Sequence, residues 1–155
     1  MFVRTPSGRK RLNVLGALDF VTKELISISN TTYITSETVC ELLRTLHARH
    51  SPLPITLVLD NARYQRCRLV QDLAEQLGIE LMFLPSYSPN LNLIERLWKF
   101  VKKRALNGKF YETFDAFRDA IQNTLENVNG THKNDIESLI TRNFQLFDHE
   151  TFLAA

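Results

Sequence analysis

The sequence has few of the features that mark secreted, zinc-binding or membrane-spanning proteins. Its two cysteines, Cys40 and Cys67, lie in amphipathic stretches without metal-ligand spacing, so we expect neither a disulfide nor a zinc site. The apolar runs are strand-sized and interrupted by charge, and the basic start MFVRTPSGRKR lacks the apolar segment of a signal peptide. These absences predict a cytoplasmic protein that does not associate with membranes.

The net charge is also small, +2 for 155 residues, of which 44% are hydrophobic and 23% charged. This composition is typical of one globular domain with a sizeable core. The positive charge is nevertheless clustered, which indicates a phosphate-rich ligand. The clusters are Arg4, Arg9, Lys10 and Arg11 near the start, and Arg96, Lys99, Lys102, Lys103, Arg104 and Lys109 after the middle.

Hydrophobic periodicity predicts an α/β protein with the element order β-β-α-β-α-β-α-α-α. Strands are expected over residues 12–20, 24–29, 55–59 and 79–84, with Asp19 in the hairpin that joins the first two. The run ITLVL before Asp60 is typical of a fully buried strand. The alternation of strands and helices predicts a partly parallel sheet with helices on its faces, and ligands gather at the carboxyl ends of such strands.

Boundary residues place the helices. Ser36 is expected to cap a helix that ends before Ser51, and Gly78 to terminate the next one. Three more helices are expected over about residues 90–106, after Thr113 and after Asn134. The inward faces of the second and third helices are expected to carry Leu69, Val70, Leu73, Ala74 and Leu77, and Ile94, Leu97, Trp98 and Val101.

Two acidic residues are candidates for function: Asp60 directly after a predicted strand, and Glu95 near the start of a predicted helix. Asp60, at the end of a strand, fits a turn residue, the magnesium-holding acid of a nucleotide-binding fold, a receiver-type phosphoacceptor or a nuclease metal ligand. The chain has no G-x-x-x-x-G-K-[ST] segment and no acidic pair after an earlier strand, which disfavours the nucleotide and receiver readings. Glu95 fits a capping-box acid or a functional carboxylate, and it shares a helix side with Lys99 and Lys102.

The segment VLDNARYQR, followed by LPSYSPNLNLIERLWKFVKK with 34 residues between Asp60 and Glu95, resembles the catalytic domain of bacterial insertion-sequence transposases of the mariner superfamily. The resemblance extends back through SGRKRLNVLGALD and fades after about residue 128. It implies a DDE catalytic domain over residues 1–128, followed by a C-terminal helical extension over 129–155. The implied fold is ribonuclease-H-like, with a mixed sheet flanked by helices.

The resemblance also implies a chemistry. Such enzymes hold Mg²⁺ or Mn²⁺ with an acidic triad, and its second and third members map onto Asp60 and Glu95. Two divalent ions activate an oxygen nucleophile and neutralise the phosphate in this type of phosphodiester cleavage and strand transfer. The implied partner is DNA, both element ends and target, and the implied assembly is a homo-oligomer, a dimer. The DNA backbone is expected to be contacted by six basic residues, whose alternative role is that of an ordinary solvent-exposed surface: Arg9, Lys10, Arg11, Lys99, Lys102 and Lys103.

One part of the family pattern has no counterpart here. The family places its first aspartate on an opening, central strand upstream of SGRKRLNVLGALD, so we expect an N-terminally truncated domain that lacks this strand. Asp19 does not replace it, because the antiparallel arrangement puts it at the opposite sheet edge, roughly 25 Å away. Unpaired strand edges would make the chain a poor monomer. The alternative function is a catalytically inactive remnant that binds DNA or dimerises.

Overall fold

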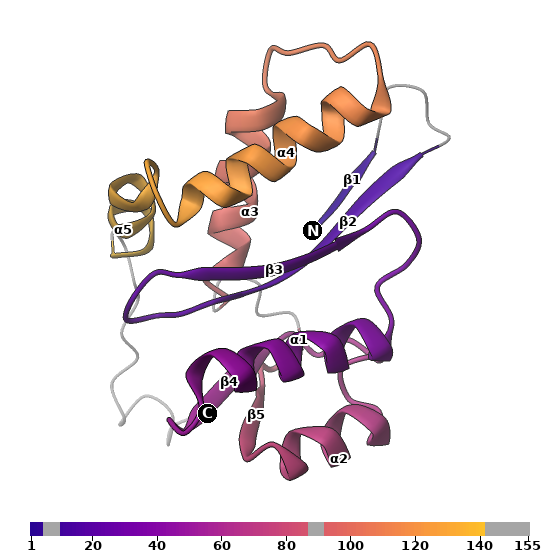
Figure 1. Ribbon diagram of the computed structural model, residues 1–155, viewed down its shortest axis with the longest axis vertical. Helices are drawn as coiled ribbons and strands as arrows, with labels where there is room; N and C mark the ends of the chain where they lie inside the picture. The colour runs from indigo at the N-terminus through magenta and orange to yellow at the C-terminus, as the bar shows by residue number, and fades with distance from the viewer. Residues whose placement is uncertain (5–9, 87–91, 142–155) are drawn as a thin grey trace.

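The computed structural model describes residues 1–4, 10–86 and 92–141 (Figure 1). Every expected strand and helix is present, with bounds that differ from the expected ones by at most about four residues. One short strand, β1, was not expected. The strands are β1 (Phe2–Arg4), β2 (Arg11–Leu18), β3 (Leu25–Asn30), β4 (Ile55–Leu59) and β5 (Ile79–Phe83). The helices are α1 (Ser36–His50), α2 (Arg68–Gln76), α3 (Ile94–Leu106), α4 (Phe114–Val128) and α5 (Lys133–Thr141).

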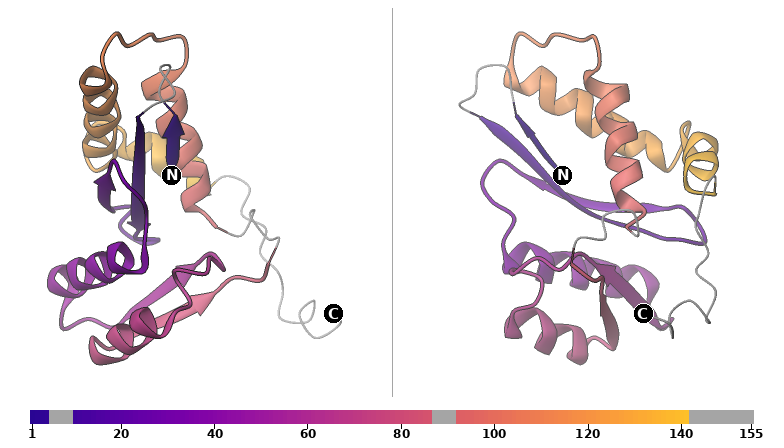
Figure 2. Two further views of the ribbon diagram at one scale, coloured as in Figure 1. Left: turned by 90° about the vertical axis from the view of Figure 1, so that its right-hand side faces the viewer. Right: turned by 180° about the vertical axis from the view of Figure 1, so that it is seen from behind.

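The strands of the described residues form two sheets rather than one continuous sheet. The order β1-β2-β3 is antiparallel throughout, and β4 pairs with β5 in parallel, as the strand-helix alternation predicts. The expected hairpin is confirmed: Leu18 faces Leu25, and the Asp19 carboxylate accepts hydrogen bonds from the backbone N–H groups of Val21 at 2.7 Å and Thr22 at 2.8 Å. Figure 2 shows the two sheets as separate layers.

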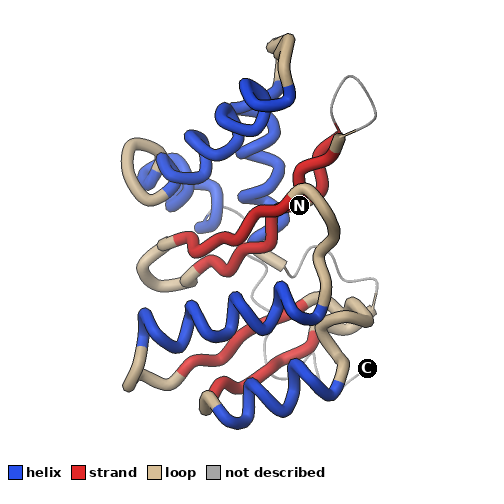
Figure 3. The backbone as a smooth tube through the Cα atoms, turned by 45° about the vertical axis from the view of Figure 1, so that its right-hand side comes forward, coloured by secondary structure: helices blue, strands red, loops and turns tan. Residues whose placement is uncertain are grey.

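The helices cover these sheets in two groups. Helix α1 packs against β2, β3 and α2, and its buried face joins that of α2 in one core cluster, to which Leu15 and Leu57 of the two sheets add (Figure 3). Helices α3, α4 and α5 build a second cluster on the other face of the antiparallel sheet, against Leu12 and Val14 of β2 and Leu25 of β3. Within it α3 approaches β2 so closely that a Cβ added at Gly16 would lie 2.7 Å from Cη2 of Trp98. This contact fixes α3 on the antiparallel sheet.

Three local expectations were wrong. The N-cap of α1 is Thr35 rather than Ser36, because the Thr35 hydroxyl accepts from the Thr38 N–H and the Thr38 hydroxyl accepts from the Thr35 N–H. Leu69 is 53% exposed, since only Val70 and Ala74 of α2 are fully buried. Strand β4 is not fully buried either, because helices cover one face only and Val58, on the other face, is 45% exposed.

The expectations for Gly78, Thr113 and Trp98 hold. Gly78 has a φ of +67° directly after α2, Thr113 caps α4 by accepting from the Ala116 N–H, and Trp98 is buried. Cys40 and Cys67 are free thiols. In the described part of the chain, no helix has both the length and the apolar character needed to cross a membrane.

Candidate functional site

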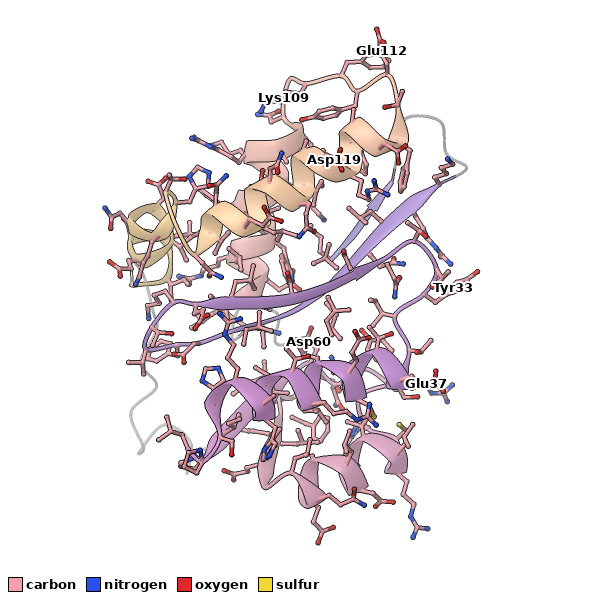
Figure 4. The ribbon with its side chains drawn as sticks, viewed as in Figure 1. Tyr33, Glu37, Asp60, Lys109, Glu112 and Asp119 are labelled. Carbon is pink, nitrogen blue, oxygen red and sulfur yellow. The ribbon has the colours of Figure 1, made fainter. Side chains whose placement is uncertain are left out.

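Asp60 and Glu95 are connected through one asparagine. Asp60 is exposed at the carboxyl end of β4, and Glu95 lies half-buried in the first turn of α3. The side-chain amide of Asn92 donates a hydrogen bond to Asp60 Oδ1 at 2.5 Å, across 32 residues of sequence. Figure 4 labels Asp60 near the centre of the molecule, between the two sheet layers. The end of β4 is therefore attached to the start of α3.

Asn92 also shapes the beginning of α3. Its side-chain oxygen accepts from the Ile94 N–H at 3.3 Å, and its backbone carbonyl accepts from the Glu95 N–H at 3.2 Å. An asparagine before a helix commonly supplies such an acceptor to otherwise unpaired N–H groups. Here its amide nitrogen remains available, and that is the group that holds Asp60. One side chain thus orients both the helix bearing Glu95 and the carboxylate of Asp60.

The electrostatics at the amino group of Met1 connect the two carboxylates. Burial lowers the pKa of this group. The negative charge of Glu95 raises the pKa, the positive charge of Lys102 lowers it further, and the negative charge of Asp60 raises it. All three side chains therefore lie within electrostatic range of one nitrogen atom. Met1 is held there by backbone hydrogen bonds to Val14, which donates its N–H to the Met1 carbonyl at 2.7 Å.

Polar residues follow Asp60 in the loop after β4. The amide of Asn61 donates to Ser86 Oγ at 3.2 Å, which ties the loops after β4 and β5 together, and its buried Oδ1 has no hydrogen-bond partner in the described structure. Burial raises the pKa of the Tyr64 hydroxyl, and the Asp60 charge raises it further, so this phenol remains a proton donor at neutral pH. Gln65 is buried and accepts from the Ala62 N–H, which is a structural role.

The basic residues expected to contact DNA separate into three places. Lys99 and Lys102 are exposed on the helix stripe that begins at Glu95, whereas Lys103 lines a groove between α3 and α5. Lys10 and Arg11 lie at the start of β2, over the rings of Phe114 at 5.3 Å and Tyr33 at 3.6 Å. Figure 4 shows Tyr33 well apart from Asp60. Arg9 lies outside the described residues.

The donors at this site suit a hard divalent cation in kind. Mg²⁺ and Mn²⁺ prefer carboxylate and amide oxygens and retain several waters, and Asp60, Glu95 and the unpaired oxygen of Asn61 are donors of that type. Their number is smaller than a complete site needs. Over residues 1–4, 10–86 and 92–141, no group of three or more histidine, cysteine, aspartate and glutamate side chains is placed to hold a metal ion.

Asn92 is the residue that sequence reasoning missed. An asparagine just before a helix ordinarily supplies an acceptor to the helix N–H groups, and Asn92 does this for Ile94. The second role depends on the spatial meeting of β4 and α3, and no short-range pattern reports it. The only available signal was the pairing of an asparagine with a glutamate three residues later, in a motif downstream of a strand-terminal aspartate.

The chain is similar to known proteins in its fold and in its sequence family. The Mos1 transposase catalytic domain, solved with raltegravir and Mg, shares the fold with a TM-score of 0.62 and 15% identity, over 94% of this chain and 82% of that one. The catalytic core domain of BIV integrase matches with a TM-score of 0.58 and 17% identity, over 99% of this chain and 91% of that one. A simian T-cell lymphotropic virus intasome in complex with PP2A regulatory subunit B56 gamma matches with a TM-score of 0.59 and 17% identity, over 78% of this chain and 44% of that one. The chain thus spans 44% of the intasome chain it matches. A comparison with curated protein sequences gives no match.

These structural neighbours are integrase and transposase catalytic cores, so the expected ribonuclease-H-like α/β fold is confirmed. The family model that matches describes a DDE superfamily endonuclease and covers residues 2–118, which include both Asp60 and Glu95. The chain belongs to the DDE superfamily endonucleases.

Proposed function

We propose that this chain is the catalytic domain, or part of it, of an insertion-sequence transposase of the mariner superfamily. In this proposal it acts on DNA by metal-dependent phosphodiester cleavage and strand transfer, at the ends of an element and at its target. The observation that carries the proposal is the hydrogen bond from Asn92 to Asp60, which brings the strand-terminal acid to the helix that bears Glu95. Membership of the DDE endonuclease family supports the reaction class.

In the proposed site, Asp60 and Glu95 hold Mg²⁺ or Mn²⁺, which supplies charge neutralisation at the phosphate and activation of an oxygen nucleophile. The residues of the chain have defined tasks around it. Asn92 fixes one oxygen of Asp60, and no other hydrogen bond to this carboxylate forms among the described residues. Lys99 and Lys102, exposed on the stripe of Glu95, attract the DNA backbone, and the protonated hydroxyl of Tyr64 is available as a donor near Asp60.

The proposal is tested by nicking of supercoiled plasmid in the presence of Mn²⁺. Wild type is compared with Asp60→Asn and Glu95→Gln, and Asp72→Asn serves as the matched control because Asp72 is an exposed carboxylate of α2 paired only with Arg68. We expect nicking by wild type and by the control, and loss on the order of 10²-fold or more in the two site variants. Equal nicking by all four proteins would refute the assignment of Asp60 and Glu95.

A second function is a DNA-binding or dimerising module without catalysis. The observation that favours it is the number of carboxylates: the described residues place two, not three, acids at this site. Its signature is DNA binding that weakens steeply with salt, combined with no nicking by any of the four proteins. Size-exclusion chromatography then tests the dimer, since a monomer at every concentration leaves only the DNA-binding form of this alternative.

A further inference from the structure

A basic groove lies between α3 and α5. Its volume is about 980 Å³, and its lining includes Arg96, Phe100, Lys103, Arg104, Lys109 and Asp135. Four cations and one carboxylate give it an excess of positive charge larger than the +2 of the whole chain. In Figure 4, Lys109 lies at the top of the molecule, far from Asp60. The groove therefore extends well beyond the site described above.

The groove occupies its own stripe of α3. Successive residues of an α-helix are rotated by about 100°, so residues three and four apart share a side. The core stripe carries Leu97, Trp98, Val101 and Ala105; the stripe of the proposed acid site carries Glu95, Lys99 and Lys102; and the groove stripe carries Arg96, Phe100, Lys103 and Asn107. The cations of the groove are thus not the ones that accompany Glu95.

Three of the groove cations have no ion pair among the residues that the structure describes. In the part of the chain that the structure describes, no ion pair forms with Lys103, Arg104 or Lys109, and all three are exposed. Asp135, the one carboxylate of the lining, has its Oδ2 3.8 Å from Nδ1 of His132. Like charges gathered around one hollow repel each other, which raises the attraction of the hollow for a polyanion.

The helix dipole explains only part of this cluster. Lys103 and Arg104 lie in the last turn of α3, where cations are favourable without any ligand. Arg96 lies in the first turn, where a cation is unfavourable, and Lys109 lies beyond the helix, where its ammonium contacts the Arg104 carbonyl at 3.1 Å. The C-terminal end of α3 thus accounts for Lys103, Arg104 and Lys109, whereas Arg96 stands against the dipole.

The walls of the groove are fixed. The guanidinium of Arg96 donates to the Leu139 carbonyl at 3.4 Å, which attaches α3 to α5, and the ring of Phe100 meets that of His132 edge-on at 5.6 Å. Ile136 and Ile140 of α5 are buried in the same core cluster as α3. A preformed groove loses little conformational entropy when it binds a ligand.

We propose that this groove binds the phosphate backbone of one strand of a DNA duplex, alongside the segment that reacts at Asp60 and Glu95. From Arg96 to Arg104 the cations extend over about 12 Å of helix, which equals the rise of about three to four nucleotides of B-form DNA. That length suits a polymer better than a single anion. The choice of DNA rests on the proposed function, whereas the polyanion site itself rests on the groove.

The test is fluorescence anisotropy of a labelled 20-base-pair duplex, measured with EDTA so that no metal chemistry contributes. The triple variant Lys103→Ala, Arg104→Ala and Lys109→Ala is compared with a control that loses the same charge elsewhere, Arg44→Ala, Arg68→Ala and Arg118→Ala. Arg96 is retained because it joins α3 to α5. We expect the groove variant to bind on the order of tenfold or more weakly, with a log-log salt slope smaller by about 2 to 3. The control should change both values much less.

The other outcomes are decisive too. Equal weakening in both triple variants would show that only overall charge matters and would overturn the proposal. Loss of binding to polyglutamate with unchanged duplex binding would make the groove a protein-binding site and would also overturn it. The anisotropy assay contains EDTA and measures no cleavage, so failure of the nicking assay leaves this result readable. Circular dichroism and thermal melting check that each triple variant is folded.

Discussion

Removal of the Asn92 side chain should affect both the stability of α3 and the metal affinity of the site. In Asn92→Ala, the acceptor for the Ile94 N–H and the donor to Asp60 are both lost. A side-chain acceptor just before a helix contributes up to about 1 kcal/mol to the free energy of unfolding, and a hydrogen bond to an exposed carboxylate adds a further ~0.5 kcal/mol after solvent screening. For a domain of this size, that sum lowers the melting temperature by about 3 to 6 °C.

Asn92→Asp separates the two roles. Aspartate still accepts from the helix N–H groups, so the cap is kept, but it brings a second carboxylate to where an amide nitrogen lies 2.5 Å from Asp60 Oδ1. Two carboxylates at that distance do not both ionise readily without a cation. Without metal this variant should therefore melt below wild type, and Mn²⁺ should raise its melting temperature more than that of wild type.

The assay is thermal melting with and without Mn²⁺, combined with Mn²⁺ titration by calorimetry. Loss of a residue that orients a metal ligand commonly reduces metal affinity by about 10- to 100-fold, and we expect about tenfold for Asn92→Ala. Asn123→Ala, an exposed substitution on α4, is the control for loss of an asparagine. If Asn92→Ala melts like wild type and binds Mn²⁺ equally well, the positioning role of Asn92 is refuted.

Two further predictions concern stability. Burial alone would raise the pKa of Asp19, but hydrogen bonds from the Thr22 and Val21 N–H groups outweigh it and lower the pKa. This contribution is therefore present above the unfolded pKa of 3.8 and is lost as the pH falls through the lower folded value. After solvent screening, urea unfolding of Asp19→Asn should show a loss of at most about 0.5 kcal/mol at pH 7, and this loss should vanish toward pH 2. Gly16→Ala should cost about 1 to 3 kcal/mol and alter Trp98 fluorescence, because the new Cβ would lie 2.7 Å from Cη2 of that ring; an unchanged melting temperature and spectrum would contradict the close packing.

Local sequence patterns predicted the elements well, because each depends on residues close together in the chain. The hairpin around Asp19, the end of α2 before Gly78 and the cap at Thr113 all follow from such short-range chemistry. The error at Thr35 has the same origin: Thr35 and Ser36 are both good capping residues, and the reciprocal bond from Thr38 decides between them.

Features that depend on how elements meet were not predictable in the same way. A run such as ITLVL has the same letters whether helices cover one face of the strand or both, and Val58 is exposed because only one face is covered. The three-residue strand β1 is too short to show a period, and only its pairing with β2 defines it. The bond from Asn92 to Asp60 belongs to the same class, since it joins two loops 32 residues apart.

Helix α3 brings the local and the spatial information together. Its buried stripe, with Leu97 and Val101 fully enclosed, sets the rotation of the helix against β2. Once that rotation is set, a period of 3.6 residues requires Glu95 and Arg96 to face different surfaces although they are neighbours in sequence. The split of one basic cluster into Lys102 beside the acids and Lys103 in the groove is therefore a consequence of core packing. The two charged surfaces can consequently be altered independently without changing the residues that hold the helix in place.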